Sequence, residues 1–208
     1  MHAYDLYLAS RSPRRRELLT QMGIRHQVLL APEPPGEDEP RLAQETPADY
    51  VLRTARDKAL RGWHWLQQQQ LPCLPVLASD TCVSLDETIF GKPRDHDEAV
   101  TFLKHLSGTE HDVRTAVVLA CPPVPGNTSP ILIERVSHTR VWMRALQTAE
   151  IEHYCNGREP YDKAGGYGIQ GPAARFITRI DGSHTGVMGL PLFETLGILE
   201  LAGVPIHD

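Results

Sequence analysis

An arginine-rich helix start is the stretch of this chain best suited to bind a negatively charged ligand. A short apolar strand ends at residue 9, and Ser12-Pro13 then favours a helix start, because serine caps helix N-termini and proline tolerates the first helical position. The three arginines at 14–16 fall in the first turn. A helix N-terminus carries about +0.5 charge, so cations are unfavourable there unless N–H and guanidinium groups share one phosphate-like anion. A solvated basic turn is the alternative interpretation.

A single aspartate, Asp80, follows an apolar run at residues 74–79 that is typical of a buried strand. Ligands of open α/β sheets usually bind at the carboxyl ends of strands, where we expect this side chain. A carboxylate in that place can hold Mg²⁺ or accept a proton from water. The alternative interpretation is a turn aspartate that caps the hairpin predicted over residues 82–90, and the local sequence supports both equally.

Two lysines lie in backbone settings that suit a phosphate ligand. Lys92 stands between a glycine and a proline, so a rigid loop restricts its ammonium group, although an exposed loop lysine is the simpler interpretation. Lys163 lies in the segment 162–171, whose four glycines let the backbone approach a ligand closely. Gln170 in the same segment carries an amide that can pair with the edge of a base.

Composition limits the classes of ligand and partner. The chain has 208 residues and a net charge of −5, which disfavours an extended nucleic-acid partner, so the expected ligand is a small anion held by a local basic patch. The four cysteines are widely spaced and read as reduced thiols of a cytoplasmic protein. We find no signal-like N-terminus and no run of roughly 20 apolar residues, so no membrane partner is expected.

Alternating strands and helices are expected to position these residues, followed by an antiparallel section, which predicts a mixed-sheet α/β domain. The first part is predicted as a strand at 4–9, a helix at 13–22, a strand at 26–30, a long loop at 31–47 and a helix at 48–69. The second part is predicted as a strand at 74–79, a hairpin of 82–85 and 88–90, a helix at 95–106, strands at 111–121 and 131–143, a helix at 148–157, a hairpin of 175–180 and 184–188, and a helix from about 191.

Four segments taken together resemble one family. They are residues 8–19 (LASRSPRRRELL); Ser79-Asp80-Thr81 with Gly91-Lys92-Pro93; residues 106–108 with His111, Val113 and Thr115; and residues 162–171 with 187–191. Their order and spacing, over nearly the whole chain, resemble those of the Maf family of nucleoside triphosphate pyrophosphatases. The resemblance implies one domain over residues 1–208, with a mixed, strongly twisted sheet in two lobes and a nucleotide cleft between them.

The resemblance also implies a reaction and a site. The reaction would be hydrolysis of a nucleoside triphosphate to the monophosphate and pyrophosphate, dependent on a divalent cation, Mg²⁺ or alternatively Mn²⁺. Asp80 would be the catalytic carboxylate and a metal ligand, with Glu39 as the second metal ligand and Glu37 and Asp38 as alternatives to it. The phosphate site would consist of Ser10, Arg14, Arg15, Lys58, Lys92 and Lys163.

Three positions bear on the substrate. The branch of the family that resembles dTTP/UTP pyrophosphatases has the residue types of Arg14, Thr81 and Gln170, whereas the branch acting on 7-methyl-GTP tends to have tryptophan, glutamine and glutamate there. Ser79 departs from the alanine that is commoner in the pyrimidine branch. A purine-directed pyrophosphatase and a nucleotide-binding cell-division regulator with little catalysis are the alternatives, and a homodimer is a further expectation.

Overall fold

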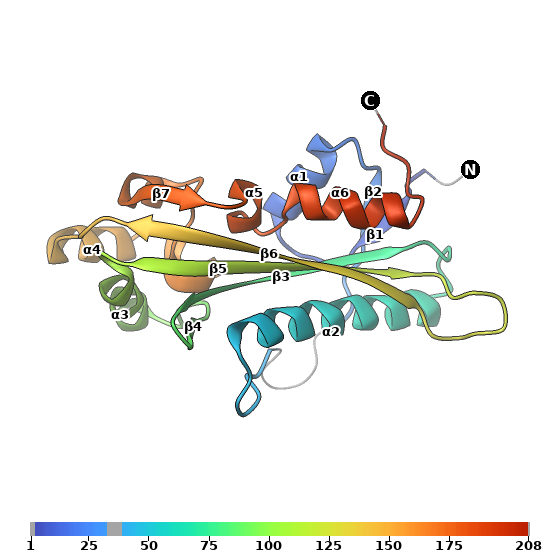
Figure 1. Ribbon diagram of the computed structural model, residues 1–208, viewed down its shortest axis with the longest axis horizontal. Helices are drawn as coiled ribbons and strands as arrows, with labels where there is room; N and C mark the ends of the chain where they lie inside the picture. The colour runs from blue at the N-terminus through green and yellow to red at the C-terminus, as the bar shows by residue number, and fades with distance from the viewer. Residues whose placement is uncertain (1–2, 33–38, 208) are drawn as a thin grey trace.

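The computed structural model describes residues 3–32 and 39–207 and contains a seven-stranded mixed sheet (Figure 1). The strands are β1 (Leu6–Leu8), β2 (His26–Val28), β3 (Val76–Leu85), β4 (Thr88–Phe90), β5 (Glu110–Cys121), β6 (Ile131–Met143) and β7 (Ile177–Asp181). They lie in the order β2-β1-β3-β5-β6-β7, and β4 pairs with β3 outside this order. β1 is parallel to β2 and β3, and all other pairs are antiparallel. The predicted mixed α/β class is therefore confirmed.

Helices cover both faces of the sheet (Figure 1). The α-helices are α1 (Pro13–Gln21), α2 (Pro47–Gln68), α3 (His96–Leu106), α4 (Thr148–Cys155), α5 (His184–Val187) and α6 (Leu192–Leu201). Three 3₁₀ turns are η1 (Glu159–Asp162), η2 (Ala164–Gly166) and η3 (Pro172–Phe176). α2 packs on one face, and α1 and α6 pack on the other. Successive side chains of β3 point to opposite faces of the sheet and so contact both helical layers. Val76 and Ala78 pack towards α2, whereas Leu77 packs towards α1 and α6.

The sequence of α2 explains why it forms and which face it buries. Thr46 caps its N-terminus by accepting a hydrogen bond from the Asp49 N–H, and Pro47 occupies the first turn. The buried positions of the helix recur with helical spacing and pack against β3 and β5. They include Val51, Thr54, Ala55, Ala59, Trp63 and Leu66.

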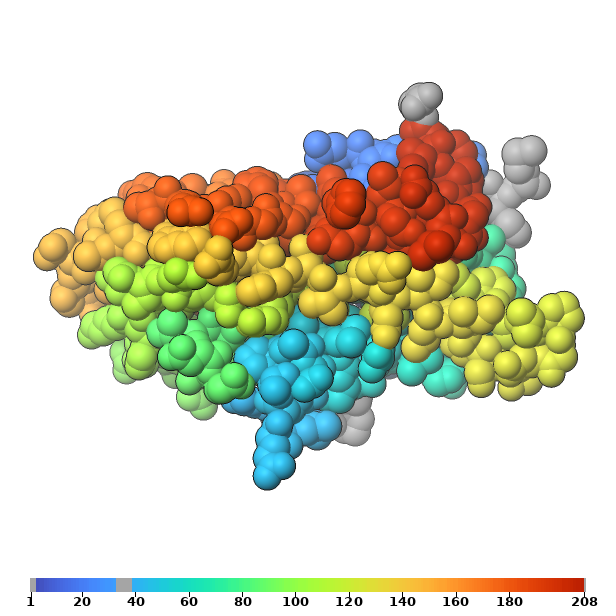
Figure 2. Space-filling view, viewed as in Figure 1, coloured from blue at the N-terminus to red at the C-terminus, as the bar shows by residue number. Residues whose placement is uncertain are grey.

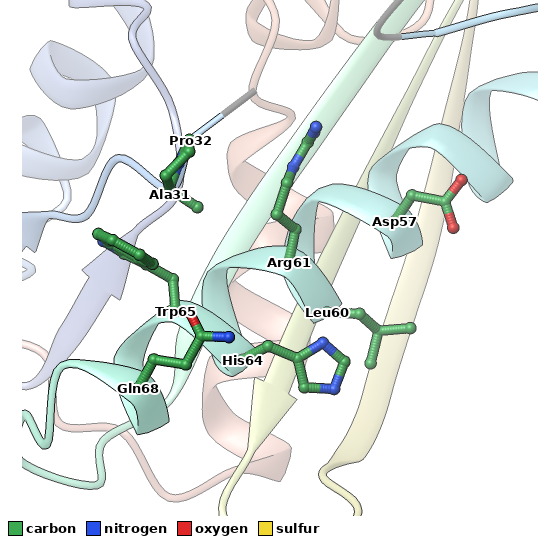
Figure 3. A pocket seen from close by; sticks show the side chains of 8 residues that line it. All are labelled: Ala31, Pro32, Asp57, Leu60, Arg61, His64, Trp65 and Gln68. Atoms are coloured by element: carbon green, nitrogen blue, oxygen red, sulfur yellow. The ribbon is translucent and has the colours of Figure 1, made fainter. Parts of the chain in front are cut away.

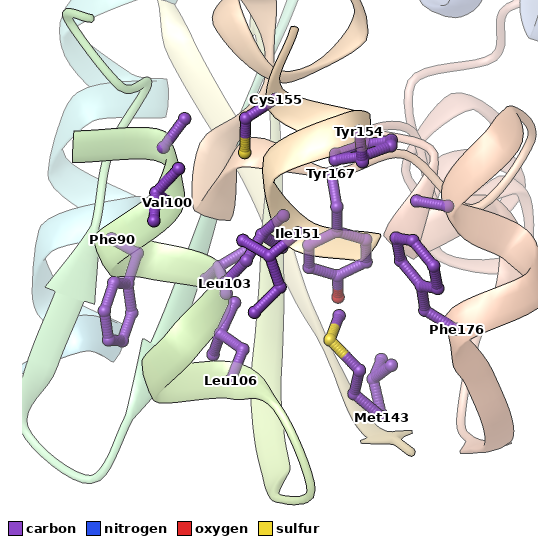
Figure 4. Packing of buried hydrophobic residues seen from close by; sticks show 14 of the residues in the cluster. Phe90, Val100, Leu103, Leu106, Met143, Ile151, Tyr154, Cys155, Tyr167 and Phe176 are labelled. Carbon is purple, nitrogen blue, oxygen red and sulfur yellow. The ribbon is translucent and has the colours of Figure 1, made fainter. Parts of the chain in front are cut away.

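The far halves of β3, β5 and β6 belong to a second lobe. There α3, α4 and the 3₁₀ turns enclose an apolar cluster with edge-to-face aromatic contacts between Tyr154 and Phe176 and between Phe90 and Phe102 (Figure 4 labels most of these rings). The three long strands therefore run through both lobes. The predicted two-lobed, twisted sheet is confirmed.

Strand β3 has an unpaired edge at the junction of the lobes. On this edge β1 pairs with β3 as far as Leu77, and β4 pairs with it from Val83 onwards. Residues 79–82 lie between these two partners and keep only the β5 partner on the opposite edge. Side chains from both faces of β3 can therefore reach the same opening.

Some local predictions were wrong. Asp80 lies in the middle of β3 and not at a strand end, because the two predicted runs join into one ten-residue strand that crosses both lobes. Residues 184–187 form α5 and not a hairpin strand, since the Ser183 hydroxyl caps this turn by accepting from the Gly186 N–H. The N-cap of α4 is Gln147, where a capping box with Glu150 is formed. The Ser12 side chain makes no cap bond in α1.

The space-filling view shows an elongated molecule with α6 lying over β6 (Figure 2). Phe193 of α6 is 85% exposed, so this helix buries its other side. None of the described helices is long and apolar enough to cross a membrane.

Candidate active site

One large cleft contains every residue that the sequence predicts for the site and that the structure describes. Its volume is about 1270 Å³ and it lies at the unpaired edge of β3. Glu37 and Asp38, the alternatives to Glu39, lie outside the described residues. The predicted residues that line the cleft are Ser10, Arg14, Arg15, Glu39, Lys58, Asp80, Thr81, Lys92, Lys163 and Gln170.

Both oxygens of Asp80 are held by donors from α2. The Lys58 ammonium lies 2.6 Å from Oδ1, and the Thr54 hydroxyl donates to Oδ2 over 2.7 Å. Asp80 is 5% exposed, and such a buried charge needs partners of this kind. The two donors lie one helical turn apart, so a single face of α2 presents them to the carboxylate.

Lys58 also forms an ion pair with Glu39, which brings two carboxylates to one ammonium group. Among the described residues no group of three or more His, Cys, Asp or Glu side chains is arranged as a metal cluster. Asp80 and Glu39 nonetheless already share one positively charged group, the Lys58 ammonium. Carboxylate oxygens are also the donors that Mg²⁺ prefers, with water and phosphate oxygens completing its shell. The pair therefore fits a divalent cation that is partly held by a phosphate ligand.

The start of α1 places two arginines in different environments. Arg15 donates from Nε to the Gly189 carbonyl over 2.7 Å, and its other nitrogens lie 3.3 Å from the Thr81 hydroxyl and 3.4 Å from Ser10 Oγ. Burial lowers the pKa of Arg15, while Asp80 and Glu39 act in the opposite direction. Arg14 has a looser contact, with its Nη1 3.8 Å from Asp162 Oδ2.

A chain of hydroxyl groups leads from Arg15 into the sheet. The Thr115 hydroxyl donates to the Gly186 carbonyl over 2.8 Å, so its oxygen must accept in its 2.9 Å contact with Thr81. The Thr81 hydrogen is therefore directed to Thr115, and Arg15 donates to the Thr81 oxygen. Towards a ligand, Thr81 offers only a hydrogen-bond acceptor.

The glycine-rich segment packs tightly against β3. Gly165 has a φ of +71°, and a Cβ there would lie 2.9 Å from Val83, which explains the need for glycine. Its N–H donates to the Gly91 carbonyl, which ties the segment to the loop that carries Lys92. Lys163 is held by the Glu159 carbonyl at 3.0 Å and by Asp162. Lys92 and Gln170 are both exposed in the cleft.

Tyr167 anchors this segment in the core of the second lobe (Figure 4). Its hydroxyl lies 2.6 Å from Nε2 of the buried His111, and the two rings meet edge to face. Desolvation lowers the pKa of His111 to about 4, so the imidazole is neutral near pH 7. The same burial raises the pKa of Tyr167, and the contact is a bond between two neutral groups.

Cys82 supplies a thiol two residues after Asp80 on β3. Its thiol is buried, and desolvation followed by the Asp80 charge raises its pKa to about 12. The thiolate, which is the reactive form, is therefore absent near neutral pH. Covalent catalysis by this cysteine is disfavoured.

A smaller hollow of about 440 Å³ lies on the outer side of α2 (Figure 3). Figure 3 shows Ala31 and Pro32 opposite Trp65, with Arg61 directed towards β3. Of the predicted site residues, none lines this hollow. Because the chain leaves the described residues directly after Pro32, we assign no site to it.

Sequence reasoning missed two polar side chains that contact site residues. Thr54 was read only as part of an amphipathic helix, although it lies four residues before Lys58 and so shares its face. Asp162 was read as part of a glycine-rich motif, although its carboxylate contacts both Arg14 and Lys163. The helical spacing of Thr54 and Lys58 could have indicated the first residue. Adjacency to Lys163 could have indicated one contact of Asp162, but no local pattern indicates its contact with Arg14.

Comparisons with known proteins show the family of the chain. The family model described as "Maf-like protein" matches residues 5–202. The "dTTP/UTP pyrophosphatase" of Bordetella avium is 59% identical over 99% of this chain and 98% of its own length. The "dTTP/UTP pyrophosphatase" of Nitrosomonas europaea is 51% identical over 97% of this chain and 96% of its own.

Among solved structures, a HAM1 protein from Coxiella burnetii is 17% identical and covers 65% of this chain and 72% of its own. Its TM-score of 0.36 is too low to support a conclusion. Family assignment therefore rests on the sequence matches, which extend over almost the entire chain. By these matches, the chain belongs to the Maf family.

Proposed function

We propose that this protein hydrolyses dTTP and UTP to the nucleoside monophosphates and pyrophosphate. The observation that carries the proposal is the convergence of all the described motif residues on one cleft, in a chain 59% identical to a protein named dTTP/UTP pyrophosphatase. The cleft carries basic side chains that would bind phosphates and a carboxylate pair that would hold a cation. Such an arrangement suits a triphosphate, whose negative charges repel an incoming nucleophile until they are neutralised.

Asp80 and Glu39 would hold the divalent cation, for which we propose Mg²⁺, with Mn²⁺ as the alternative. When bound, this cation would neutralise phosphate charge and stabilise the charge that develops on the leaving group. Arg14, Lys92 and Lys163 would bind the triphosphate from the other side. Their guanidinium and ammonium groups would offset the negative charge of the phosphates while the bond to the α-phosphorus breaks.

Asp80 would orient the attacking water and accept its proton. The water oxygen forms a bond to the α-phosphorus, the bond from this phosphorus to the bridging oxygen breaks, and pyrophosphate leaves with the bonding electrons. Asp80 suits this role because it has a lone pair on each oxygen beyond those used by Lys58 and Thr54. Ser10 and Arg15 would complete the phosphate site beside it.

Base selection would fall to Thr81, Gln170 and Arg14. Because the Thr81 hydrogen is directed to Thr115, Thr81 can accept from the N3–H of thymine or uracil but cannot donate to the bare N3 of cytosine. The exposed Gln170 amide can add a donor to O4. Sites that read a base by hydrogen bonds discriminate strongly against mismatched partners.

A turnover screen with Mg²⁺ tests the proposal. Pyrophosphate release is measured for dTTP, UTP, dCTP, dATP, GTP and 7-methyl-GTP, with an Asp80→Asn variant as the inactive control. We expect kcat/KM for dTTP and UTP to exceed that for every other nucleotide by about 100-fold or more. Preference for 7-methyl-GTP or another purine nucleotide would replace the pyrimidine assignment, and no turnover of any nucleotide would favour a nucleotide-binding regulator.

We propose three further properties on sequence grounds. Residues 1–208 would act as a single domain, the protein would work in the cytoplasm, and it would form a homodimer. Size-exclusion chromatography with light scattering tests the last of these directly.

A further inference from the structure

Thr54 is a buried hydroxyl whose bonding the proposed mechanism does not explain. Its side chain lies on α2 and is 2% exposed. Its Oγ1 lies 2.7 Å from Asp80 Oδ2, and also 2.9 Å from the Tyr50 carbonyl and 3.1 Å from the Val51 carbonyl. Three acceptors therefore surround a group with one hydrogen.

The hydrogen of Thr54 belongs to Asp80. A threonine inside a helix usually donates back to a carbonyl three or four residues earlier, and here both such carbonyls are within reach. The carboxylate is nevertheless the nearest acceptor, and bonds to ionised acceptors are the stronger ones. Thr54 therefore donates its hydrogen to the Asp80 carboxylate of β3, and not to a carbonyl of its own helix.

We propose that Thr54 is a positioning residue that fixes the plane of the Asp80 carboxylate for attack on the α-phosphorus. The proposal rests on the proposed role of Asp80. One donor leaves a carboxylate free to rotate about its terminal bond, which is a broad torsion, whereas donors on both oxygens fix its plane. Lys58 supplies one donor and Thr54 supplies the other.

Thr54 becomes more important once substrate is bound. Lys58 is shared with Glu39 and belongs to the proposed phosphate site, so an arriving triphosphate competes for its ammonium group. Thr54 is uncharged and buried, and no phosphate competes for its hydrogen. Among residues 3–32 and 39–207, Lys58 and Thr54 are the side-chain donors to Asp80, so Thr54 remains when a phosphate engages Lys58.

The test compares two variants with a matched control. Thr54→Val has nearly the same shape but no hydroxyl, and Thr54→Ser keeps the hydroxyl. Thr195→Val is the control, because Thr195 is equally buried in a helix and donates to a carbonyl four residues earlier, with no carboxylate partner. We expect Thr54→Val to lower kcat for dTTP about 10- to 100-fold, as expected for a displaced reacting group, with KM changed less than about threefold.

Rescue and binding separate positioning from a structural role. Thr54→Ser should return kcat to within about fivefold of the wild-type value, and Thr195→Val should leave it unchanged. Affinity for an α,β-imido analogue of dUTP, measured by calorimetry, should stay within about threefold in Thr54→Val. Wild-type kcat in Thr54→Val, or an equal loss in Thr195→Val, overturns the proposal.

A double variant distinguishes failure of this inference from failure of the proposed function. If Thr54 acts through Asp80, adding Thr54→Val to Asp80→Asn causes no further loss, whereas independent roles give multiplied losses. An additional tenfold loss in the double variant contradicts the proposal even if Thr54→Val alone is slow. If Asp80→Asn itself keeps turnover, the proposed function of Asp80 fails, whatever the Thr54 variants do.

Discussion

Among the single residues of the cleft, several charged side chains are already paired with one another. Asp80 and Glu39 share Lys58, and Asp162 contacts Lys163 and Arg14. A triphosphate must therefore exchange partners with these side chains. This exchange favours ligands with several negative charges, because one phosphate alone cannot compensate for all the broken pairs.

Asp80→Asn is expected to keep the fold and lose turnover. The amide replaces one oxygen, so it cannot accept from both Lys58 and Thr54, and it is neither a base nor a strong metal ligand. We expect the pyrophosphate release rate to fall by about 10²–10⁴-fold. Asp86→Asn in the β3–β4 turn is the control, since asparagine tolerates the left-handed backbone there, and its rate should be normal. Near-normal turnover in Asp80→Asn contradicts the catalytic role.

The two arginines of α1 should respond differently to removal. Arg14→Ala removes a side chain whose ion pair with Asp162 is loose, so kcat/KM should fall roughly 10- to 150-fold while the Tm stays unchanged. Arg15→Ala also removes the bonds to Gly189 and Thr81, so the Tm should fall too. The expected decrease is roughly 2–4 °C for each kcal/mol lost from the free energy of unfolding. Equal thermal stability of both variants would contradict this difference, and unchanged kinetics in both would exclude a phosphate role.

Residue types at the site could be predicted because motifs concentrate them in short segments. Arg14 and Arg15 follow one strand, and Lys163 and Gln170 share one glycine-rich segment. The long-range partners of the site residues could not be predicted, because they come from distant segments. Arg15 meets Gly189 across 174 residues of sequence, and Thr54 meets Asp80 across 26. No local pattern in the sequence specifies such pairs.

Among the elements, α2 connects the sheet to the proposed cation site. One face of this helix packs against β3 and β5, and the same face carries Thr54 and Lys58 beside Asp80. Its amphipathic pattern allowed its prediction almost to the residue. The unpaired edge of β3 between Leu77 and Val83 was not predicted, because strand pairing depends on contacts between segments and not on composition.

We expect helix α2 also to control how a cation enters. Lys58 pairs with both Asp80 and Glu39, so a divalent ion would meet less net negative charge there until a bound nucleotide draws the ammonium group away. Lys58→Met should therefore bind Mn²⁺ without nucleotide at least about tenfold more tightly, equivalent to ~1.4 kcal/mol, while its dTTP turnover falls. The measurement is calorimetry with Mn²⁺ alone, supported by the rise in Tm that Mn²⁺ produces.

The control for this prediction is Lys104→Met, which removes an exposed lysine from α3. It should leave both Mn²⁺ affinity and turnover unchanged. Weaker Mn²⁺ binding by Lys58→Met than by the wild type would show that Lys58 assists cation binding, which is opposite to the prediction.

At the scale of the whole molecule, ion pairs join segments that are far apart in sequence. The chain ends meet where Asp5 contacts both Arg25 and His207, and these hydrogen bonds lower the pKa of Asp5. Arg56 of α2 binds Glu134 of β6 through two contacts, and this pairing lowers the pKa of Glu134. Carboxylates of this kind stabilise the fold above their unfolded-state pKa, and the stabilisation is lost as the pH falls through their lower folded-state pKa.

The buried His111 adds a further loss of stability on acidification, and this loss begins at a higher pH than the loss from the carboxylates. Its pKa is about 4 in the folded protein against an ordinary value of 6.5, mainly through desolvation, with the Asp112 charge acting in the opposite direction. The folded state therefore excludes a proton that the unfolded state accepts, so stability is complete above about pH 6.5 and falls as the pH drops towards 4. At pH 5 this costs on the order of 2 kcal/mol, or about 4–8 °C in Tm.

His111→Gln isolates this contribution, because glutamine does not titrate and its amide can still reach the Tyr167 hydroxyl. The variant is expected to have a lower Tm than the wild type at pH 7.5, since its fit in the core is poorer, but to lose about 4–8 °C less between pH 7.5 and pH 5. His64→Gln, at an exposed position of α2, should follow the wild-type pH dependence. Because Tyr167 anchors the segment that carries Gln170, wild-type substrate selectivity should also weaken at low pH before global unfolding. Parallel Tm curves for the wild type and His111→Gln from pH 7.5 to 5 would show that the imidazole is not kept neutral by the fold.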